Sequence, residues 1–316
     1  MSKAKQSGGK AATKKKNTIL PLLLCLLLLL AGVAIFFYPI VSNYFAELNH
    51  TEVIVSYQQQ VDAMEQEQIA QAWEQAREYN ENLAGDPVHD PFVPGSGYAL
   101  PDNYMDVLNI DGDGVMGYLE IPKIDVYLPI YHGTDEEALQ DGVGHMESTA
   151  LPIGTEGGHS VLSGHRGLPN AELFTNLNLL EEGDYFYIHV LDETLAYQVD
   201  QITVVEPDEL SQIAAVPGED LVTLLTCTPY GVNTQRLLVR GVRTEYVPPE
   251  ETGVSTVSNL LQSTTSQSFL TGIALGLGIL LLMVLVLFVV FRIRRRKQKS
   301  KAAGNPPLEP PSGPSG

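Results

Sequence analysis

Two long apolar stretches, one near each end of the 316-residue chain, constrain its fold more than any other feature. Residues 18–38 are almost wholly apolar, and residues 269–291 contain no charged side chain. About 20 apolar residues are enough to cross a bilayer, so both stretches are predicted to be transmembrane helices. The folded part of the protein must therefore be built from the region between them.

The basic residues of the chain predict its orientation in a membrane. Lys14, Lys15 and Lys16 precede the first stretch, and a basic run from Arg292 to Lys301 follows the second. Basic flanks stay in the cytoplasm, which places both ends inside and residues 39–268 outside. The first stretch could instead be a cleaved signal peptide. Its apolar core is long for one and no small-x-small cleavage site follows, so a retained anchor is predicted.

The region between the two stretches is strongly acidic. It holds 37 of the 38 Asp and Glu residues but only six of the 19 Lys and Arg residues, a formal charge of −31. Such a surface repels phosphate backbones, which excludes nucleic acid as a partner. The charge is interpreted first as a source of solubility, and a basic peptide partner is the second interpretation.

The exported region begins with a predicted helix and continues as strands. Residues 57–83 carry apolar side chains near helical spacing, and the Gly- and Pro-rich residues 85–101 predict an irregular loop that could act as a lid. Residues 171–181 are predicted to form a short helix. Short segments typical of β-strands favour a mainly β sandwich or barrel. These segments are residues 117–124, 126–131, 159–164, 184–190, 195–205, 221–226 and 236–244.

Cys227 is the main candidate for chemistry. The other cysteine, Cys25, lies in an apolar stretch, so no disulfide can form within the exported region. Cys227 ends a strand-like run and precedes turn residues, which presents its thiol at a rim. Arg236 begins the next strand and lies across the hairpin, where a guanidinium would favour a thiolate or hold an oxyanion. The alternative is a small buried hydrophobic side chain.

A cysteine nucleophile needs a proton donor for its leaving group, usually His. His165 follows a predicted strand, so it lies at a strand end as Cys227 does. His159 begins the same strand and would lie at its far end. The other histidines are interpreted as surface or turn residues: His50, His89, His132, His145 and His189.

No metal site is predicted. Residues 111–114 resemble the start of a calcium loop, but the later ligands and the closing Glu of an EF-hand are missing. A turn is the preferred interpretation. No group of His and Cys has the spacing of a zinc site.

Three elements, in the order in which they stand along the chain, resemble the sortase family. Residues 223–227 read Thr-Leu-Leu-Thr-Cys and are similar to the sortase signature Thr-Leu-x-Thr-Cys. Arg236 follows nine positions later, as the sortase arginine does, and residues 162–167 resemble the sortase histidine segment. The resemblance runs from about residue 85 to residue 243. Residues 90–92, Asp-Pro-Phe, resemble the lid motif of class C (pilin-polymerising) sortases, which also carry a C-terminal membrane anchor.

The resemblance implies a closed β-barrel of about eight strands with N-terminal helices, flanked here by two transmembrane helices. It implies that the Cys227 thiolate attacks the Thr–Gly bond of a Leu-Pro-x-Thr-Gly-like sorting signal. His165 would protonate the departing amine, and Arg236 would stabilise the oxyanion. A Lys amine of another pilin subunit would then resolve the thioacyl enzyme, without a cofactor. Asp90 would pair with Arg236, and Phe92 would cover Cys227.

These interpretations divide the chain into parts and place it in the membrane of a Gram-positive bacterium, with the catalytic domain outside the cell. The predicted parts are a cytoplasmic tail (1–17), a first anchor (18–38), a helical segment (39–84), a lid loop (85–104), the catalytic barrel (105–247), a linker (248–268), a second membrane helix (269–291) and a cytoplasmic tail (292–316).

Three other functions compete with a class C sortase. A sortase of another class would anchor proteins to the cell wall, but the lid motif and the second membrane helix argue against it. A cysteine protease would transfer the acyl group to water, and the position of Arg236 suits it less well. A non-enzymatic surface protein could also end in an apolar span and a basic tail, and it would tolerate the loss of Cys227.

Overall fold

The computed structural model describes residues 19–83 and 103–246, with Pro248 and scattered helical residues between 271 and 296. The elements in chain order are α1 (Ile19–Ala63), α2 (Gln66–Asn82), β1 (Val115–Ile121), η1 (Pro122–Ile124), β2 (Val126–His132), α3 (Glu136–Asp141), β3 (Val143–His145), β4 (His159–Ser163), η2 (Leu177–Leu179), β5 (Tyr185–Val190), β6 (Glu193–Val205), η3 (Leu210–Ile213), β7 (Leu221–Thr228) and β8 (Gln235–Thr244).

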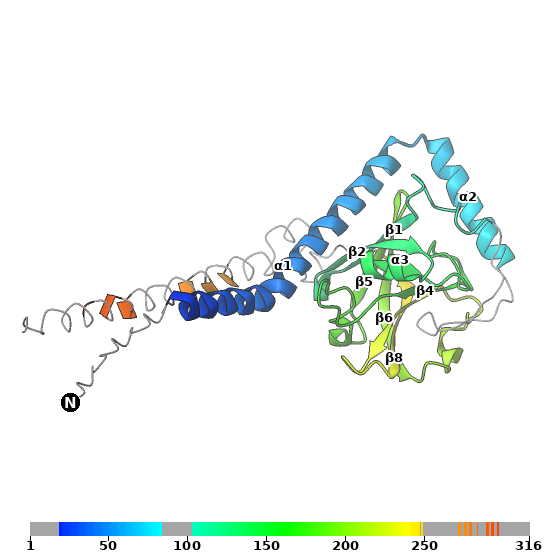
Figure 1. The fold of residues 1–316 in the computed structure, drawn as a ribbon. Coiled ribbons are helices and arrows are strands. Elements are labelled where there is room, and N and C mark those ends of the chain that lie inside the picture. Colours follow the sequence, from blue (N-terminus) through cyan, green and yellow to red (C-terminus); the bar gives the residue numbers. More distant parts are fainter. Residues whose placement is uncertain are drawn as a thin grey trace, which may run out of the picture.

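The strands form a closed barrel in the order β1-β2-β3-β4-β7-β8-β6-β5, with β5 paired again to β1 (Figure 1). The pairs β2–β3 and β4–β7 are parallel and the other pairs are antiparallel. The predicted mainly β barrel is confirmed, and each segment predicted as a strand is one. The sequence missed β3, because three residues are too few to show an alternating pattern.

Alternation along the strands divides the buried side chains between two faces of the barrel wall. One face points into the barrel, where side chains such as Leu119, Ile188 and Leu224 are fully buried. The other face of β4, β7 and β8 carries a smaller group, here called the outer cluster. The outer cluster consists of Met146, Val161, Val205, Ile213, Leu225 and Leu238.

Helix α1 is continuous from the first apolar stretch into the folded domain, where Ile54, Tyr57 and Val61 pack on the barrel. The Tyr57 hydroxyl donates a hydrogen bond of 3.2 Å to the Met116 carbonyl in β1. The prediction of a single helix over residues 57–83 is wrong in one respect. It is interrupted after Ala63, and Glu65 caps α2 through a capping box.

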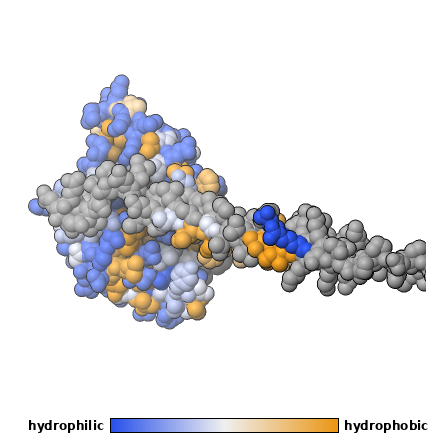
Figure 2. Space-filling model, turned by 90° about the vertical axis from the view of Figure 1, so that its left-hand side faces the viewer, coloured by the Kyte–Doolittle hydropathy of each residue, from blue (hydrophilic) through white to orange (hydrophobic). Residues whose placement is uncertain are grey.

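Among the described residues, one helix is long and apolar enough to cross a membrane, and it is α1. Most of its large apolar side chains before residue 43 are exposed, and Figure 2 shows apolar surface on the part of the molecule that projects from the domain. The second predicted membrane helix, residues 269–291, lies largely outside the described residues and stays a prediction.

Two local predictions differ from the structure. Residues 171–181 form a loop with one short 3-10 turn, η2, rather than a helix. Leu173 has a φ of 40° in this loop, a left-handed conformation that a regular helix cannot contain. Helix α3 was not predicted, although Asp135 caps it by accepting a hydrogen bond from the Ala138 backbone N–H.

The strand directions show at which end of the barrel the apolar N-terminal half of α1 leaves the domain. The pairings make β1, β4 and β7 run the same way, so their carboxyl ends share one end of the barrel. At this end the Asn43 side chain of α1 accepts a hydrogen bond of 2.8 Å from the Glu172 backbone N–H. The carboxyl end of β7, which carries Cys227, is thus the end at which the apolar N-terminal half of α1 leaves the domain.

Candidate active site

Cys227 and Arg236 lie directly opposite each other in the antiparallel ladder of β7 and β8. Side chains of directly opposed residues share one face of a sheet, so the thiol and the guanidinium are neighbours. Alternation places both on the face of the outer cluster, two residues along from Leu225 and Leu238. The side chain of Arg236 is 4% exposed and donates hydrogen bonds to the backbone carbonyls of Asn233 (3.3 Å) and Gln235 (3.2 Å).

His165 reaches the same place from the neighbouring strand. Ser163 pairs with Leu225 in the parallel ladder of β4 and β7, and the Gly164 N–H donates to the Leu225 carbonyl at 3.0 Å. Two residues further along the same register, His165 lies beside Cys227. The structure therefore brings together the three residues that the sequence singled out for catalysis.

Two effects of opposite sign act on the pKa of the imidazole at this site. Burial lowers the pKa of His165 below its ordinary value, and the Glu136 carboxylate at the start of α3 opposes this effect. The guanidinium of Arg236 stabilises negative charge nearby, as on a thiolate or an oxyanion.

Two supporting residues escaped the sequence analysis. The Thr226 hydroxyl donates a 2.6 Å hydrogen bond to the Gly164 carbonyl, which joins β7 to the turn that carries His165. Arg166 donates to the Thr228 hydroxyl at 3.1 Å. It also donates to the Thr175 carbonyl (3.2 Å) and the Asn178 side chain (2.6 Å). In the sequence, the only sign of their supporting role is that Thr226 directly precedes Cys227 and Arg166 directly follows His165.

The predicted lid residues, Asp90 and Phe92, lie outside the described residues. Their pairing with Arg236 and Cys227 therefore stays a prediction.

The other described histidines lie in regular secondary structure: His50 in α1, and His132, His145, His159 and His189 in strands of the barrel. Both ring nitrogens of His159 are engaged, by Thr223 (2.8 Å) and the Ala214 carbonyl (3.0 Å), at the far end of β4 as predicted. The interpretation of His50, His132 and His145 as surface or turn residues is wrong, because all three are buried. A lone His in a strand-like segment gives no sign of which face it occupies.

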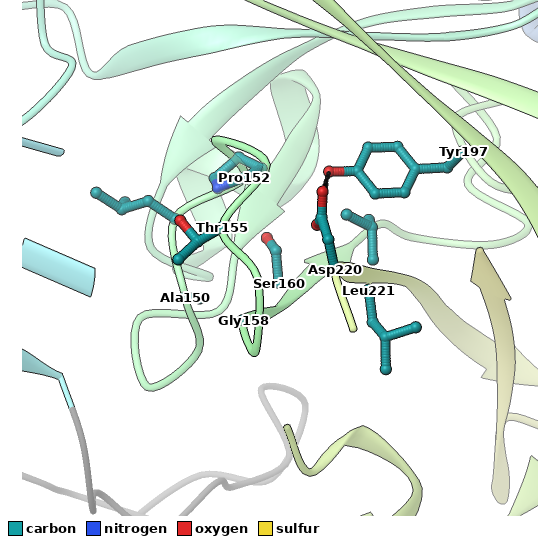
Figure 3. A pocket seen from close by; sticks show the side chains of 10 residues that line it. Ala150, Pro152, Thr155, Gly158, Ser160, Tyr197, Asp220 and Leu221 are labelled. Atoms are coloured by element: carbon teal, nitrogen blue, oxygen red, sulfur yellow. Dashed lines mark hydrogen bonds between the residues drawn. The ribbon is translucent and has the colours of Figure 1, made fainter. Parts of the chain in front are cut away.

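The opposite end of the barrel has a small pocket that could be mistaken for a reactive site (Figure 3). Ser160 points into it, and the Tyr197 hydroxyl donates a hydrogen bond of 3.1 Å to Asp220. Neither Cys nor His is among the described residues that line it.

At the turn predicted for residues 111–114, the Asp111 side chain accepts a hydrogen bond from the Asp113 backbone N–H, and the Asp113 side chain accepts one from the Val115 backbone N–H.

Comparisons with known proteins agree with this geometry. The family profile "Sortase domain" matches residues 119–244. Sortase C of Streptococcus pneumoniae is 44% identical to this chain, with 63% of this chain and 99% of that chain covered and a TM-score of 0.57. Sortase C-1 of Actinomyces oris is 49% identical, with 57% and 99% covered and a TM-score of 0.54.

Two curated relatives are similar over a shorter part of their length. Sortase D of Bacillus subtilis is 35% identical over 130 residues, which are 40% of this chain and 63% of that protein. Sortase SrtE1 of Streptomyces coelicolor is 31% identical over 171 residues, which are 50% of this chain and 43% of that protein. The match thus spans less than two thirds of either relative.

An eight-stranded closed barrel with a cysteine and an arginine paired at one end is the architecture of a family of cysteine transpeptidases. The chain belongs to the sortase family, and within it to the class C (pilin-related) sortases.

Proposed function

We propose that this protein is a membrane-anchored class C sortase that joins pilin subunits covalently. It would cleave a Leu-Pro-x-Thr-Gly-like sorting signal between Thr and Gly and transfer the acyl group to a Lys amine. The observation that carries the proposal is the pairing of Cys227 with Arg236 at the strand end that His165 also reaches.

The proposed reaction uses each of the three side chains in one role. The Cys227 thiolate, formed by proton transfer to His165, attacks the Thr carbonyl carbon, and Arg236 stabilises the oxyanion. When the C–N bond breaks, His165 gives its proton to the Gly amine, and a thioester remains. The Lys amine then attacks the thioester and gives a proton to His165. The C–S bond breaks, so an isopeptide bond forms and the thiolate is restored.

Two observations support pilin subunits as the substrates. Sortase C of Streptococcus pneumoniae has pilin substrate specificity, and sortase C of Group B Streptococcus is pilus-related. The strand end that carries Cys227 is also the end from which α1 leaves the barrel. An enzyme oriented in this way suits a sorting signal that is held close to the membrane surface.

The proposed topology and regulation follow from the sequence. Both apolar stretches span the membrane, and the barrel lies outside the cell. The segment with Asp90 and Phe92 acts as a lid that competes with the sorting signal for Arg236 and Cys227. Opening of this lid is then a step that precedes acylation.

The test uses the full-length protein in a non-ionic detergent, mixed with a Leu-Pro-x-Thr-Gly peptide and examined by intact mass spectrometry. A thioacyl adduct is expected on the wild type and not on Cys227→Ala. Arg236→Lys keeps the charge but loses the planar guanidinium, so its adduct should form more slowly. Addition of a lysine-bearing pilin domain should then give covalent pilin dimers.

Each competing function has its own outcome in this experiment. Release of the peptide as a free acid, without transfer to the pilin lysine, would identify a protease. Acylation without pilin dimers would indicate a cell-wall anchoring sortase. The absence of any adduct, also with Asp90→Ala, would reject the enzyme and favour a non-enzymatic surface protein.

A further inference from the structure

A cavity of about 500 Å³ lies between the first turns of α1 that reach the domain and the barrel. Its described lining comes from α1, from the β1–β2 hairpin and from the loop after β4, with His189 of β5. These elements lie side by side where α1 enters the domain (Figure 1). The cavity contains neither Cys227 nor His165, so it is distinct from the candidate active site. We call it the α1 cavity.

The charges that line the α1 cavity are negative. Glu47 of α1, Asp125 and Glu172 line it, and none of its described lining residues is Lys or Arg. Burial raises the pKa of Glu47 to about 7, with further contributions from the charges of Glu172 and Asp125, although a hydrogen bond from Asn43 lowers it. Another lining carboxylate, Glu120, accepts a hydrogen bond from His189 at 3.0 Å. Three carboxylates without an opposing cation in the described lining favour a cationic ligand.

His50 supplies an independent sign of a ligand. Its side chain lines the cavity and is 5% exposed, and no hydrogen bond joins its ring to another residue in the described part of the chain. Burial lowers the pKa of His50 to about 4, so the ring is neutral at pH 7 and has one nitrogen that accepts and one that donates. Buried polar side chains are nearly always satisfied, so this ring calls for a polar group inside the cavity.

The remaining walls define the rest of the ligand. Leu48, Val55 and Leu128 offer apolar surface, and Tyr44 and Tyr127 offer aromatic rings that attract cations. An ammonium group has three donors, which match two carboxylates and a neutral imidazole, and the walls suit an alkyl stem. The headgroup of an ethanolamine lipid carries a phosphate as well, and the acidic lining would repel it.

We propose that the α1 cavity binds a lysine side chain of a partner polypeptide, with the ammonium group among Glu47, Glu172 and His50. The volume exceeds that of one lysine side chain, so adjoining parts of the partner enter with it. The acidic exported region, with a formal charge of −31, draws such a basic segment towards the cavity. The binding needs no acyl transfer, so it stands or falls separately from the function proposed above.

The test is calorimetric titration of the full-length protein in a non-ionic detergent at pH 7.5. The probe is the peptide Ala-Ala-Lys-Ala-Ala with blocked ends, and the same peptide with norleucine in place of lysine is its control. The lysine peptide should bind on the order of tenfold more tightly than the norleucine peptide, the size of one charge-assisted contact. Glu47→Gln and Glu172→Gln should each remove most of this difference.

Two control variants separate the α1 cavity from other sites. Glu52 is exposed on α1 and is absent from the described lining, so Glu52→Gln should bind the lysine peptide as the wild type does. Cys227→Ala should also bind normally. The proposal is overturned if the two peptides bind equally, or if Glu47→Gln and Glu52→Gln behave alike. It is equally overturned if only nanodiscs with ethanolamine lipids, and not the peptide, respond to Glu47→Gln.

Discussion

The Thr226 hydroxyl donates a hydrogen bond of 2.6 Å to the Gly164 carbonyl, and so joins the residue before Cys227 to the residue before His165. Thr226 is fully buried, and its bond crosses between two parallel strands that have no short connection. Because Cys227 and His165 come from these two strands, this bond helps to fix the separation of the thiol and the imidazole.

Thr226→Val should therefore slow acylation more than its loss of stability explains. The change keeps the shape of the side chain but leaves the Gly164 carbonyl without this donor, which should lower the free energy of unfolding by about 1–3 kcal/mol. Acylation by a Leu-Pro-x-Thr-Gly peptide, followed by mass spectrometry at a temperature where the variant is folded, should fall roughly tenfold. Thr203→Val in β6 is the control, and equal rates for both variants would contradict the prediction.

Arg166 should position the loop that carries His165. Its guanidinium holds Thr228, Thr175 and Asn178 together through three hydrogen bonds. Arg166→Lys keeps the charge but cannot make all three, so kcat for acylation should fall roughly tenfold with little change in KM. A rise in KM with an unchanged kcat would instead mean that Arg166 binds the substrate.

Glu136→Gln should shift the pH dependence of acylation. The carboxylate of Glu136 raises the pKa of His165, so its removal should lower that pKa further. The pH at which His165 loses its proton should then fall slightly, because Glu136 is exposed and solvent screens its charge. Glu137, the exposed neighbour, provides the control in Glu137→Gln, and identical pH–rate profiles for the two variants would argue against this role.

His145 should make the protein less stable in acid. Burial lowers the pKa of His145 to about 3, although a hydrogen bond to the Ala150 carbonyl acts in the opposite direction. An unfolded chain protonates this residue near pH 6.5, so the unfolded state binds more protons between pH 6.5 and about pH 3. The free energy of unfolding should therefore decrease as the pH is lowered through this window, by about 2 kcal/mol from pH 7 to pH 5. The free energy of unfolding of His145→Gln, measured in urea, should depend less on pH than that of the wild type. The same pH dependence in both proteins would contradict the prediction.

Asp90→Ala should speed acylation if residues 85–104 act as a lid. The substitution removes the carboxylate expected to pair with Arg236, so both the guanidinium and the thiol would become more accessible. The measurement is the rate of alkylation of Cys227 by a small iodoacetamide reagent together with the rate of acylation. Asp102→Ala at the other end of this segment is the control. If neither rate rises for Asp90→Ala, the segment does not inhibit the enzyme.

The sequence by itself determined the identity of the chemistry and the class of fold. Cys227, His165 and Arg236 stand in segments whose order and spacing are characteristic, and the strands that carry them have strong β patterns. The apolar length of residues 18–38 likewise predicted an anchor without any tertiary information. These features are local, so the sequence contains them directly.

The tertiary structure decided what depends on contacts between distant segments. The parallel pairing of β4 with β7 brings His165 to Cys227, and no local pattern specifies which strands become neighbours. The bonds of Thr226 and Arg166, the burial of His145, and the α1 cavity all arise from residues far apart in the chain. Their energies depend on burial and on the direction of each donor, which only the packed barrel fixes.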